Sequence, residues 1–238
     1  MRVLVLGASG ATGSLVVRQL IRREIQTRIL IRKSAVLPEE VLESPLVETV
    51  KGSINDLGQS EMDKLLENCD AVISCLGHNI SLKGMFGKPR YLVRDAMRSV
   101  CETAERSAGK NVKIVLMSTT AYTNTSSKEK SSIGERIIFS LLTLLLPPHR
   151  DNVRAADFLI RDIGRSNKRI EWVAVRPDTL THSDVESSYE VFEYRVRSPI
   201  FNAGKTSRIN VSHFMAELVT DDRLWNKWLF KTPTVYDK

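Results

Sequence analysis

Three glycines near the start of the chain stand three residues apart, in a segment that reads Gly7-Ala8-Ser9-Gly10-Ala11-Thr12-Gly13. A dinucleotide pyrophosphate is bound by backbone N–H groups of a tight turn and by the positive end of a helix. A side chain at the first glycine would obstruct the turn, one at the second would block the phosphates, and one at the third would push the helix off the sheet. The spacing therefore predicts a phosphate site made by Gly7, Ser9, Gly10, Ala11, Thr12 and Gly13.

Two cations follow the next apolar run of the chain. Arg32 and Lys33 come directly after residues 27–31, where an NAD-binding domain usually carries an Asp or Glu for the ribose 2′-hydroxyl. Two positive charges without a carboxylate favour a 2′-phosphate, which the Arg32 guanidinium can bind through two hydrogen bonds. A solvated Arg-Lys pair that merely closes a strand is the alternative. The pair predicts NADP(H) in preference to NAD(H).

Alternating apolar runs predict the elements that position these residues. Strands are expected at 3–6, 27–31, 46–50, 71–74, 114–117 and 170–175. Helices are expected at 12–23, 60–68, 89–107, 133–146 and 152–165, with an irregular loop at 121–132. This alternation favours an α/β fold of the Rossmann type, a doubly wound parallel sheet in a single domain over residues 1–238. A small C-terminal substrate lobe is expected at 177–238, with a strand at 208–210 and a helix at 212–220.

The glycine turn, written GASGATG, resembles the fingerprint of extended and atypical short-chain dehydrogenase/reductases. These include the NmrA-like proteins and the flavin/biliverdin reductase type. The similarity extends to about Glu217 and is clearest up to Thr120. It implies a Rossmann-type fold and NAD(P)-dependent reductase activity.

The resemblance implies further cofactor contacts. The segment Gly52-Ser53-Ile54-Asn55-Asp56 is similar to a GDxxD-like element beside the adenine, where Asn55 and Asp56 would address the amino group. Ser53 stands where the family commonly has Asp. Cys75, Leu76 and Gly77 match the segment that passes under the pyrophosphate and nicotinamide ribose, with the Cys75 thiol interpreted as a packing group.

Catalytic candidates come from the same resemblance. Family members use a hydroxyl after the fifth strand together with a Tyr-x-x-x-Lys pair. Thr120 matches that hydroxyl best, with Ser118 as the second choice and also a candidate cofactor contact, although such side chains often satisfy only local backbone groups. No tyrosine of the chain has a lysine four residues later. This departure argues against an alcohol or sugar dehydrogenase.

Histidine and arginine supply the remaining candidates. His149 is a candidate proton donor because imidazole titrates near neutrality, and an ordinary surface role fits it equally. His78, directly after Gly77, is expected near the nicotinamide or its ribose. Arg176 belongs to an element similar to the family's RPxxL-type turn and is a candidate cofactor contact. His182 and His213 form no metal-ligand spacing, so no metal site is expected.

The run from Ile133 to Leu146 is strongly apolar. It can be core, a lid over an aromatic substrate or a partner surface, and burial within the domain is the favoured interpretation. Its longest stretch, Ile137 to Leu146, is ten residues, whereas spanning a bilayer takes about 20.

Composition limits the remaining classes of function. The net charge is +7, but Lys and Arg are dispersed and no zinc-finger or RNA-binding signature is present, which argues against nucleic acid. The cysteines Cys69, Cys75 and Cys101 have no CxxC spacing, and a signal peptide is not expected before the first strand. A cytoplasmic monomer or homodimer without a membrane partner is expected.

Three functions stay open at this stage. The favoured one is an NADP(H)-dependent oxidoreductase that transfers a hydride to a small conjugated acceptor such as a flavin, quinone or tetrapyrrole. The second is a non-catalytic NADP(H)-binding redox sensor of the NmrA-like type, which the missing Tyr-Lys pair supports. The third is a scaffold or assembly factor, because a fold does not fix a function.

Overall fold

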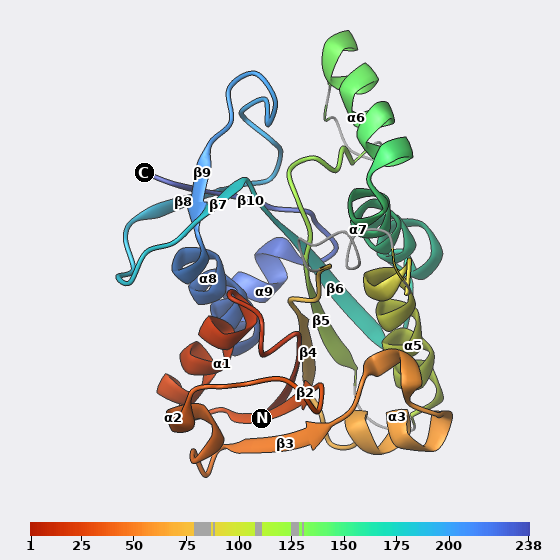
Figure 1. Ribbon diagram of the computed structural model, residues 1–238, viewed down its shortest axis with the longest axis vertical. Helices are drawn as coiled ribbons and strands as arrows, with labels where there is room; N and C mark the ends of the chain where they lie inside the picture. The colour runs from red at the N-terminus through yellow and green to blue at the C-terminus, as the bar shows by residue number, and fades with distance from the viewer. Residues whose placement is uncertain (79–86, 88, 108–110, 125–128, 130) are drawn as a thin grey trace.

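The computed structural model describes residues 1–78, 87, 89–107, 111–124, 129 and 131–238. Within them the centre of the molecule is an eight-stranded sheet of order β3-β2-β1-β4-β5-β6-β10-β8 (Figure 1). All its pairings are parallel except the antiparallel one between β10 and β8. The strands are β1 (Arg2–Leu6), β2 (Gln26–Ile31), β3 (Val47–Lys51), β4 (Ala71–Ser74), β5 (Val112–Met117), β6 (Ile170–Pro177), β8 (Tyr189–Phe192) and β10 (Thr234–Asp237).

Helices cover both faces of the sheet, so the predicted doubly wound α/β fold is confirmed. One face carries α1 (Gly13–Arg22), α8 (Arg208–Thr220) and α9 (Asp222–Trp228). The other carries α3 (Gln59–Leu66), α5 (Leu92–Arg106) and α7 (Pro147–Asp157), which continues as a π-helix over Phe158–Ile163. The short elements α2 (Glu39–Leu42) and the 3₁₀ helix η1 (Ile54–Asp56) follow β2 and β3.

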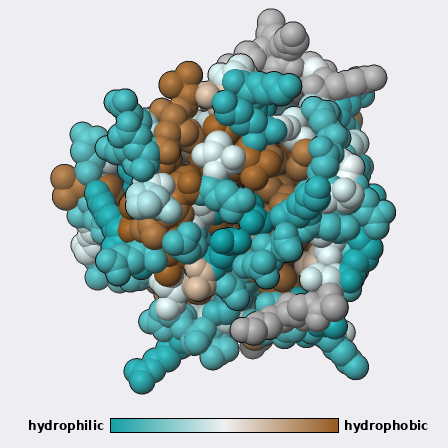
Figure 2. Space-filling model, turned by 90° about the horizontal axis from the view of Figure 1, so that it is seen from below, coloured by the Kyte–Doolittle hydropathy of each residue, from teal (hydrophilic) through white to brown (hydrophobic). Residues whose placement is uncertain are grey.

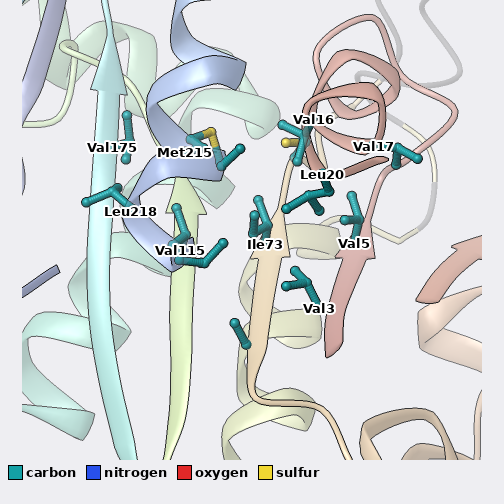
Figure 3. Close-up of a cluster of buried hydrophobic side chains, with 14 of the residues drawn as sticks. Val3, Val5, Val16, Val17, Leu20, Ile73, Val115, Val175, Met215 and Leu218 are labelled. Carbon is teal, nitrogen blue, oxygen red and sulfur yellow. The ribbon is translucent and has the colours of Figure 1, made fainter. Parts of the chain in front are cut away.

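Two apolar cores follow from the alternation of side chains along each strand. Val3 and Val5 of β1 face α1 and α8, whereas Leu4 and Leu6 face the opposite layer. Figure 3 shows the first core, in which strand residues such as Val5 meet side chains from both helices. The helix residues labelled there are Val16, Val17, Leu20, Met215 and Leu218.

The C-terminal region differs from the prediction at one strand. Residues 208–210 open α8 instead of forming a strand, because the Ser207 hydroxyl caps this helix by accepting a hydrogen bond from the Asn210 N–H at 3.4 Å. The strand lies just before it, where β9 (Lys205–Ser207) pairs with β7 (Thr179–Thr181) in a small parallel sheet.

Helix α6 (Ile133–Leu145) has the predicted position in the chain but not the predicted burial. Ile133 is 77% exposed and Leu144 is 72% exposed, while only Glu135 and Phe139 of this helix are buried. The preference for core packing is therefore wrong. In Figure 1 the helix projects from the end of the molecule, beyond the sheet, and it packs against α7.

The helices that follow and precede α6 also begin differently from expectation. Helix α7 starts at Pro147, five residues before the predicted helix at 152–165, because a proline fits the first turn of a helix. Helix α5 starts at Leu92, which leaves Pro89 outside it.

Figure 2 shows the molecule from below, relative to the view in Figure 1. The side chains on this face are mostly hydrophilic, with apolar patches between them. Within the described residues, every helix falls short of the length and apolar content that crossing a bilayer requires.

Candidate functional site

A cavity of about 280 Å³ opens where four neighbouring strands end. Its walls come from the turns after β1, β2, β3 and β4 and from the start of α5. The lining residues are Leu6, Gly7, Ser9, Gly10, Leu30, Arg32, Gly52, Ser53, Ile54, Cys75, Leu76, Gly77, His78, Pro89 and Leu92. Ligands of doubly wound folds bind at this carboxyl edge of the sheet. We call this space the first cavity.

The glycine turn has the geometry that its spacing predicts. Gly7 has a φ of 77°, and an added Cβ there would lie 2.7 Å from the carbonyl oxygen of Cys75. A Cβ at Gly13 would collide with the Gly7 carbonyl, because α1 begins directly against the turn. The turn is closed by a hydrogen bond from the Gly10 N–H to the Gly7 carbonyl oxygen at 2.9 Å. Gly7 and Gly13 are thus fixed by the protein's own backbone.

The predicted phosphate residues divide into two groups. Gly7, Ser9 and Gly10 line the first cavity, and a Cβ at Gly10 would meet only the Gly7 carbonyl oxygen, at 3.2 Å. Ala11, Thr12 and Gly13 lie outside the lining, and Thr12 is 5% exposed where it precedes α1. Cofactor contacts by these three residues stay a prediction.

Arg32 lines the first cavity, whereas Lys33 is exposed and lies outside its lining. The lining contains no Asp or Glu, and no ion pair of Arg32 occurs among the described residues. A guanidinium at the end of β2 without a neighbouring carboxylate in the wall favours an anionic ligand group. This wall suits a phosphate better than a bare ribose hydroxyl.

The wall after β3 uses different residues from those expected. Gly52, Ser53 and Ile54 line the cavity, while Asn55 and Asp56 are exposed on η1 and lie outside the lining. Ile54 and Leu30 give this part of the cavity two apolar walls, which suit the flat faces of an aromatic ring. The contacts expected of Asn55 and Asp56 stay predictions.

The segment after β4 lies at the cavity as predicted. Cys75, Leu76 and Gly77 all contribute to its wall. Burial raises the pKa of the Cys75 thiol to about 12, so this group stays protonated and is a poor nucleophile. That result agrees with a packing role.

A hydrogen bond ties His78 to α7. Its imidazole Nε2–H donates to the Oδ2 of Asp151 at 2.8 Å, and the Asp151 carboxylate is fully buried. The same carboxylate accepts from the backbone N–H groups of Val93 at 2.8 Å and Arg94 at 3.0 Å, in the first turn of α5. Asp151 therefore fixes both His78 and the beginning of α5, two parts of the cavity wall, from one position on α7.

The candidate hydroxyl groups are buried outside the first cavity. Thr120 is 2% exposed and its hydroxyl donates to Asp178 Oδ1 at 3.2 Å. The Ser118 hydroxyl is also buried, without a hydrogen-bond partner among the described residues. Neither residue is in the lining of the first cavity. Their catalytic roles stay predictions.

His149 belongs to a second cavity of about 580 Å³ where α6, α7 and the residues after β5 meet. Its ring stacks on Phe139 with the centroids 6.3 Å apart, and burial lowers the pKa of the imidazole. Tyr122, also in the lining, donates its hydroxyl to Asp157 Oδ1 at 2.9 Å, and burial is the first cause of its raised pKa. Both groups are neutral at pH 7.

The three catalytic candidates are not brought together by the fold. Thr120 and Ser118 lie at the end of β5, and His149 lies on α7 in the second cavity. Helix α7 contributes to both cavities. Its Asp151 binds His78, which lines the first cavity, and its His149 and Arg150 line the second.

Arg176 lies away from the first cavity. It is fully buried and donates to Glu129 Oε2 at 2.8 Å, to the Thr232 carbonyl at 2.7 Å and to the Tyr122 carbonyl at 3.1 Å. Burial disfavours the charged form of Glu129, but the hydrogen bond and charge of Arg176 hold the pKa of that carboxyl below its usual value. Arg176 thus binds Glu129 and backbone carbonyls of the protein, and its predicted cofactor contact stays a prediction.

The sequence did not predict two residues at or behind the wall, Leu92 and Asp151. Leu92 carries a usable signal, since it begins a helix at the carboxyl edge of the sheet. Asp151 carries none, because its partners are 58 and 73 residues away. Within the described residues, no cluster of three or more His, Cys, Asp or Glu side chains is arranged to hold a metal ion.

Comparison with known proteins agrees with this architecture. A family model described as NAD(P)H-binding matches residues 7–222. No curated protein matches the chain.

Three solved structures illustrate the likeness of the fold. A short-chain dehydrogenase/reductase of the wide type from Veillonella parvula, in complex with NADP, is 15% identical with a TM-score of 0.69 over 99% of this chain and 94% of that one. The oxidoreductase ylbE from Lactococcus lactis is 16% identical, with a TM-score of 0.69 over 100% and 91%. ChuY, an anaerobillin reductase from Escherichia coli O157:H7, is 15% identical, with a TM-score of 0.66 over 100% and 97%.

Proposed function

Because the chain belongs to the NAD(P)H-binding family whose model covers residues 7–222, we propose that it is an NADPH-dependent reductase of a planar, conjugated acceptor. The first cavity supports this proposal, because Gly7, Ser9 and Gly10 line it at the turn between β1 and α1, where a pyrophosphate binds in such folds, and a Cβ at Gly10 would approach only the Gly7 carbonyl oxygen among the described residues. Bound NADPH supplies a hydride.

The choice of NADPH over NADH depends on one observation, which is the position of Arg32. Its guanidinium stands in a wall that contains no carboxylate. A 2′-phosphate gains charge-assisted hydrogen bonds there, whereas the 2′-hydroxyl of NADH lacks the Asp or Glu that usually accepts its hydrogen bond. The wide-type structural neighbour crystallised with NADP supports the same choice.

A fluorescence titration of the full chain tests this choice. NADPH is expected to bind at least about tenfold more tightly than NADH, because a charged hydrogen bond contributes about 1.5–3 kcal/mol. Arg32→Glu should abolish the preference. Lys33→Glu is the matched control, since it makes the same charge change one residue outside the cavity wall, and it should retain most of the preference. Equal affinities of the unmodified protein for the two nucleotides would refute the assignment.

The second cavity is the proposed acceptor site. It begins directly after Thr120 and contains the aromatic rings of Tyr122, Phe139 and His149 together with the guanidinium of Arg150. Rings offer stacking surfaces to a planar conjugated molecule, and a guanidinium offers hydrogen bonds to its acidic substituents. The name of one structural neighbour, an anaerobillin reductase, supports an acceptor of this tetrapyrrole-like class.

Proton delivery needs no dedicated side chain in this reaction. The chain lacks the Tyr-x-x-x-Lys pair, and burial lowers the pKa of His149, so neither supplies an acidic group at neutral pH. A conjugated acceptor can take its proton from water after the hydride arrives. The protein then contributes by positioning the two reactants.

A non-catalytic NADP(H) sensor is the second candidate, and the state of Thr120 favours it. The hydroxyl expected to face a substrate carbonyl is buried and donates to Asp178. A panel of flavins, quinones and linear tetrapyrroles separates the two candidates by loss of absorbance of NADPH. Turnover of at least one acceptor supports the reductase, and tight NADPH binding without turnover of any of them establishes the sensor.

A further inference from the structure

The outward face of α6 is an unusual concentration of exposed apolar side chains. Five residues recur at the three- and four-residue spacing of one helix face, and their side chains are 50–77% exposed. They are Ile133, Ile137, Leu141, Leu144 and Leu145. A helix with this pattern is normally seated on a core, as α1 is, so this face is a candidate interaction surface.

The segment between β8 and β9 extends this face. A Cβ added at Gly134, in the first turn of α6, would lie 3.3 Å from Cζ of Phe201, so the Phe201 ring touches the helix. Phe201 is itself 65% exposed, and Val196 on the same segment is 55% exposed. Figure 1 shows the segment and α6 projecting toward the same end of the molecule. We call the exposed apolar residues of α6 and of residues 194–204 the apical face.

The apical face is rigid at its helical start. Ser132 and Glu135 form a reciprocal cap: the Glu135 N–H donates to the Ser132 hydroxyl at 3.2 Å, and the Ser132 N–H donates to the Glu135 carboxylate at 2.8 Å. Arg195, which is almost fully buried, places its guanidinium 3.7 Å from the same carboxylate. The helix is therefore formed before any partner binds, which lowers the conformational entropy lost on docking.

The exposed charges of the apical face are positive. Arg136 and Arg197 are exposed, and neither forms an ion pair among the described residues. Glu135 is buried, residues 194–204 contain no acidic residue, and the exposed Glu193 that precedes them is paired with Lys231 at 3.2 Å. An apolar surface edged by cations is complementary to a bilayer with anionic headgroups.

We propose that the apical face docks the protein on an anionic lipid bilayer, with α6 lying in the plane of the headgroups. At 13 residues the helix is about 20 Å long, which suits an interfacial position. A second copy of the chain is the competing occupant. Symmetric pairing of two apical faces would bring Arg136 and Arg197 toward the same residues of the partner, and like charges oppose that contact.

Vesicle co-sedimentation of the full chain tests the proposal. Vesicles of phosphatidylcholine with about a third phosphatidylglycerol should bind the protein at least about tenfold more tightly than pure phosphatidylcholine, since each cation near an anionic surface contributes roughly fivefold. Salt should weaken this binding. No binding to anionic vesicles at millimolar lipid, or binding equal to that on pure phosphatidylcholine, overturns the proposal.

Matched variants assign the binding to the apical face. Ile137→Glu with Leu141→Glu should reduce vesicle binding at least about tenfold, because two charges replace side chains that enter the bilayer. Val185→Glu places the same charge at another exposed apolar position, 72% exposed on a different loop, and should bind as the unmodified protein does. Arg136→Gln with Arg197→Gln should remove most of the preference for anionic lipid. Unchanged vesicle binding by the Ile137/Leu141 variant contradicts the proposal.

The same variants distinguish a lipid surface from a second copy. In sedimentation velocity without lipid, the unmodified protein and the Ile137/Leu141 variant should have the same oligomeric state. A dimer that is lost in the variant would show that a second copy occupies the apical face, and it would overturn the proposal. NADPH affinity reports on folding, because the apical face shares no residue with the first cavity. It should be the same in every variant.

Discussion

Helices α1 and α6 are both apolar along one face, yet they relate to the sheet in opposite ways. In α1, Val16, Val17 and Leu20 are fully buried between the sheet and α8 (Figure 3). In α6, the apolar face points outward and only one hydrophobic side chain, Phe139, is buried. Helix α6 is the more hydrophobic of the two in sequence.

The connections of the two helices explain this difference. Six residues separate β1 from α1, and α1 leads directly into the next strand, so the helix must cross over the sheet. Helix α6 starts 16 residues after β5 and leads into α7, which makes the return to β6 across the sheet. The covering position is therefore filled by α7, and α6 is left outside it. Burial follows from the path of the chain and not from apolar content alone.

The largest expected effect comes from adding one methyl group at the start of each helix. Gly13→Ala places a Cβ against the Gly7 carbonyl, a backbone atom that cannot move without opening the turn. It should lower the free energy of unfolding by more than about 3 kcal/mol and abolish NADPH binding. Gly134→Ala meets only the exposed Phe201 ring and should change stability by less than about 1 kcal/mol. Urea denaturation of both variants measures the contrast, and equal losses would contradict it.

Truncation of one leucine in each helix should give the next largest difference. Leu20→Ala removes a fully buried side chain of α1 and should cost about 2–5 kcal/mol, through lost burial and the remaining cavity. Leu141→Ala removes a side chain that is 50% exposed and should cost below about 1 kcal/mol. The midpoints and slopes of denaturant unfolding measure both changes. A Leu141→Ala variant as unstable as Leu20→Ala would show that α6 is packed in solution.

The smallest effect concerns the contact between α6 and α7. Burial lowers the pKa of His149, so the unfolded chain binds a proton at a higher pH than the folded protein does. Stability should therefore be unaffected by this group above its unfolded pKa, about 6.5, and fall as the pH drops from there toward the folded pKa. His149→Phe keeps an aromatic ring against Phe139 and removes the titratable imidazole. As the pH falls below about 6.5, the free energy of unfolding of the unmodified protein should decrease relative to that of the variant. A difference between the two proteins that stays constant with pH would contradict a buried imidazole.

Sequence predicted best where structure depends on neighbours along the chain. The glycine turn and the positions of the strands up to β6 are local patterns, and each is found as expected. Of the two cations after β2, Arg32 lines the first cavity and Lys33 does not. The helix bounds of α6 were also accessible, since Ser132 and Glu135 form a recognisable cap. The incorrect prediction of a strand at 208–210 could also have been avoided, because Ser207 is a suitable N-cap residue for a helix that begins at 208.

The remaining features depend on contacts between distant residues. Arg176 lies near the end of β6, but its burial depends on Glu129 and the carbonyl of Thr232, which no spacing in the sequence links to it. The outward direction of α6 depends on α7 occupying the sheet. The wall position of His78 was expected from Gly77, whereas its partner Asp151 was not, because the two meet only in the folded chain.

The buried carboxylate of Asp151 couples events that are far apart in the chain. It accepts from His78 at the nucleotide-side wall and from two amides of the first turn of α5, while standing on α7. By thermodynamic linkage, a ligand that binds more tightly when His78 is held by Asp151 must raise the free energy of local opening of α5 and α7 by the same amount that this contact adds to its own binding free energy. Amide hydrogen exchange at Val93 and Arg94 therefore reports ligand occupancy of the first cavity, although these two amides bind the Asp151 carboxylate and not the ligand.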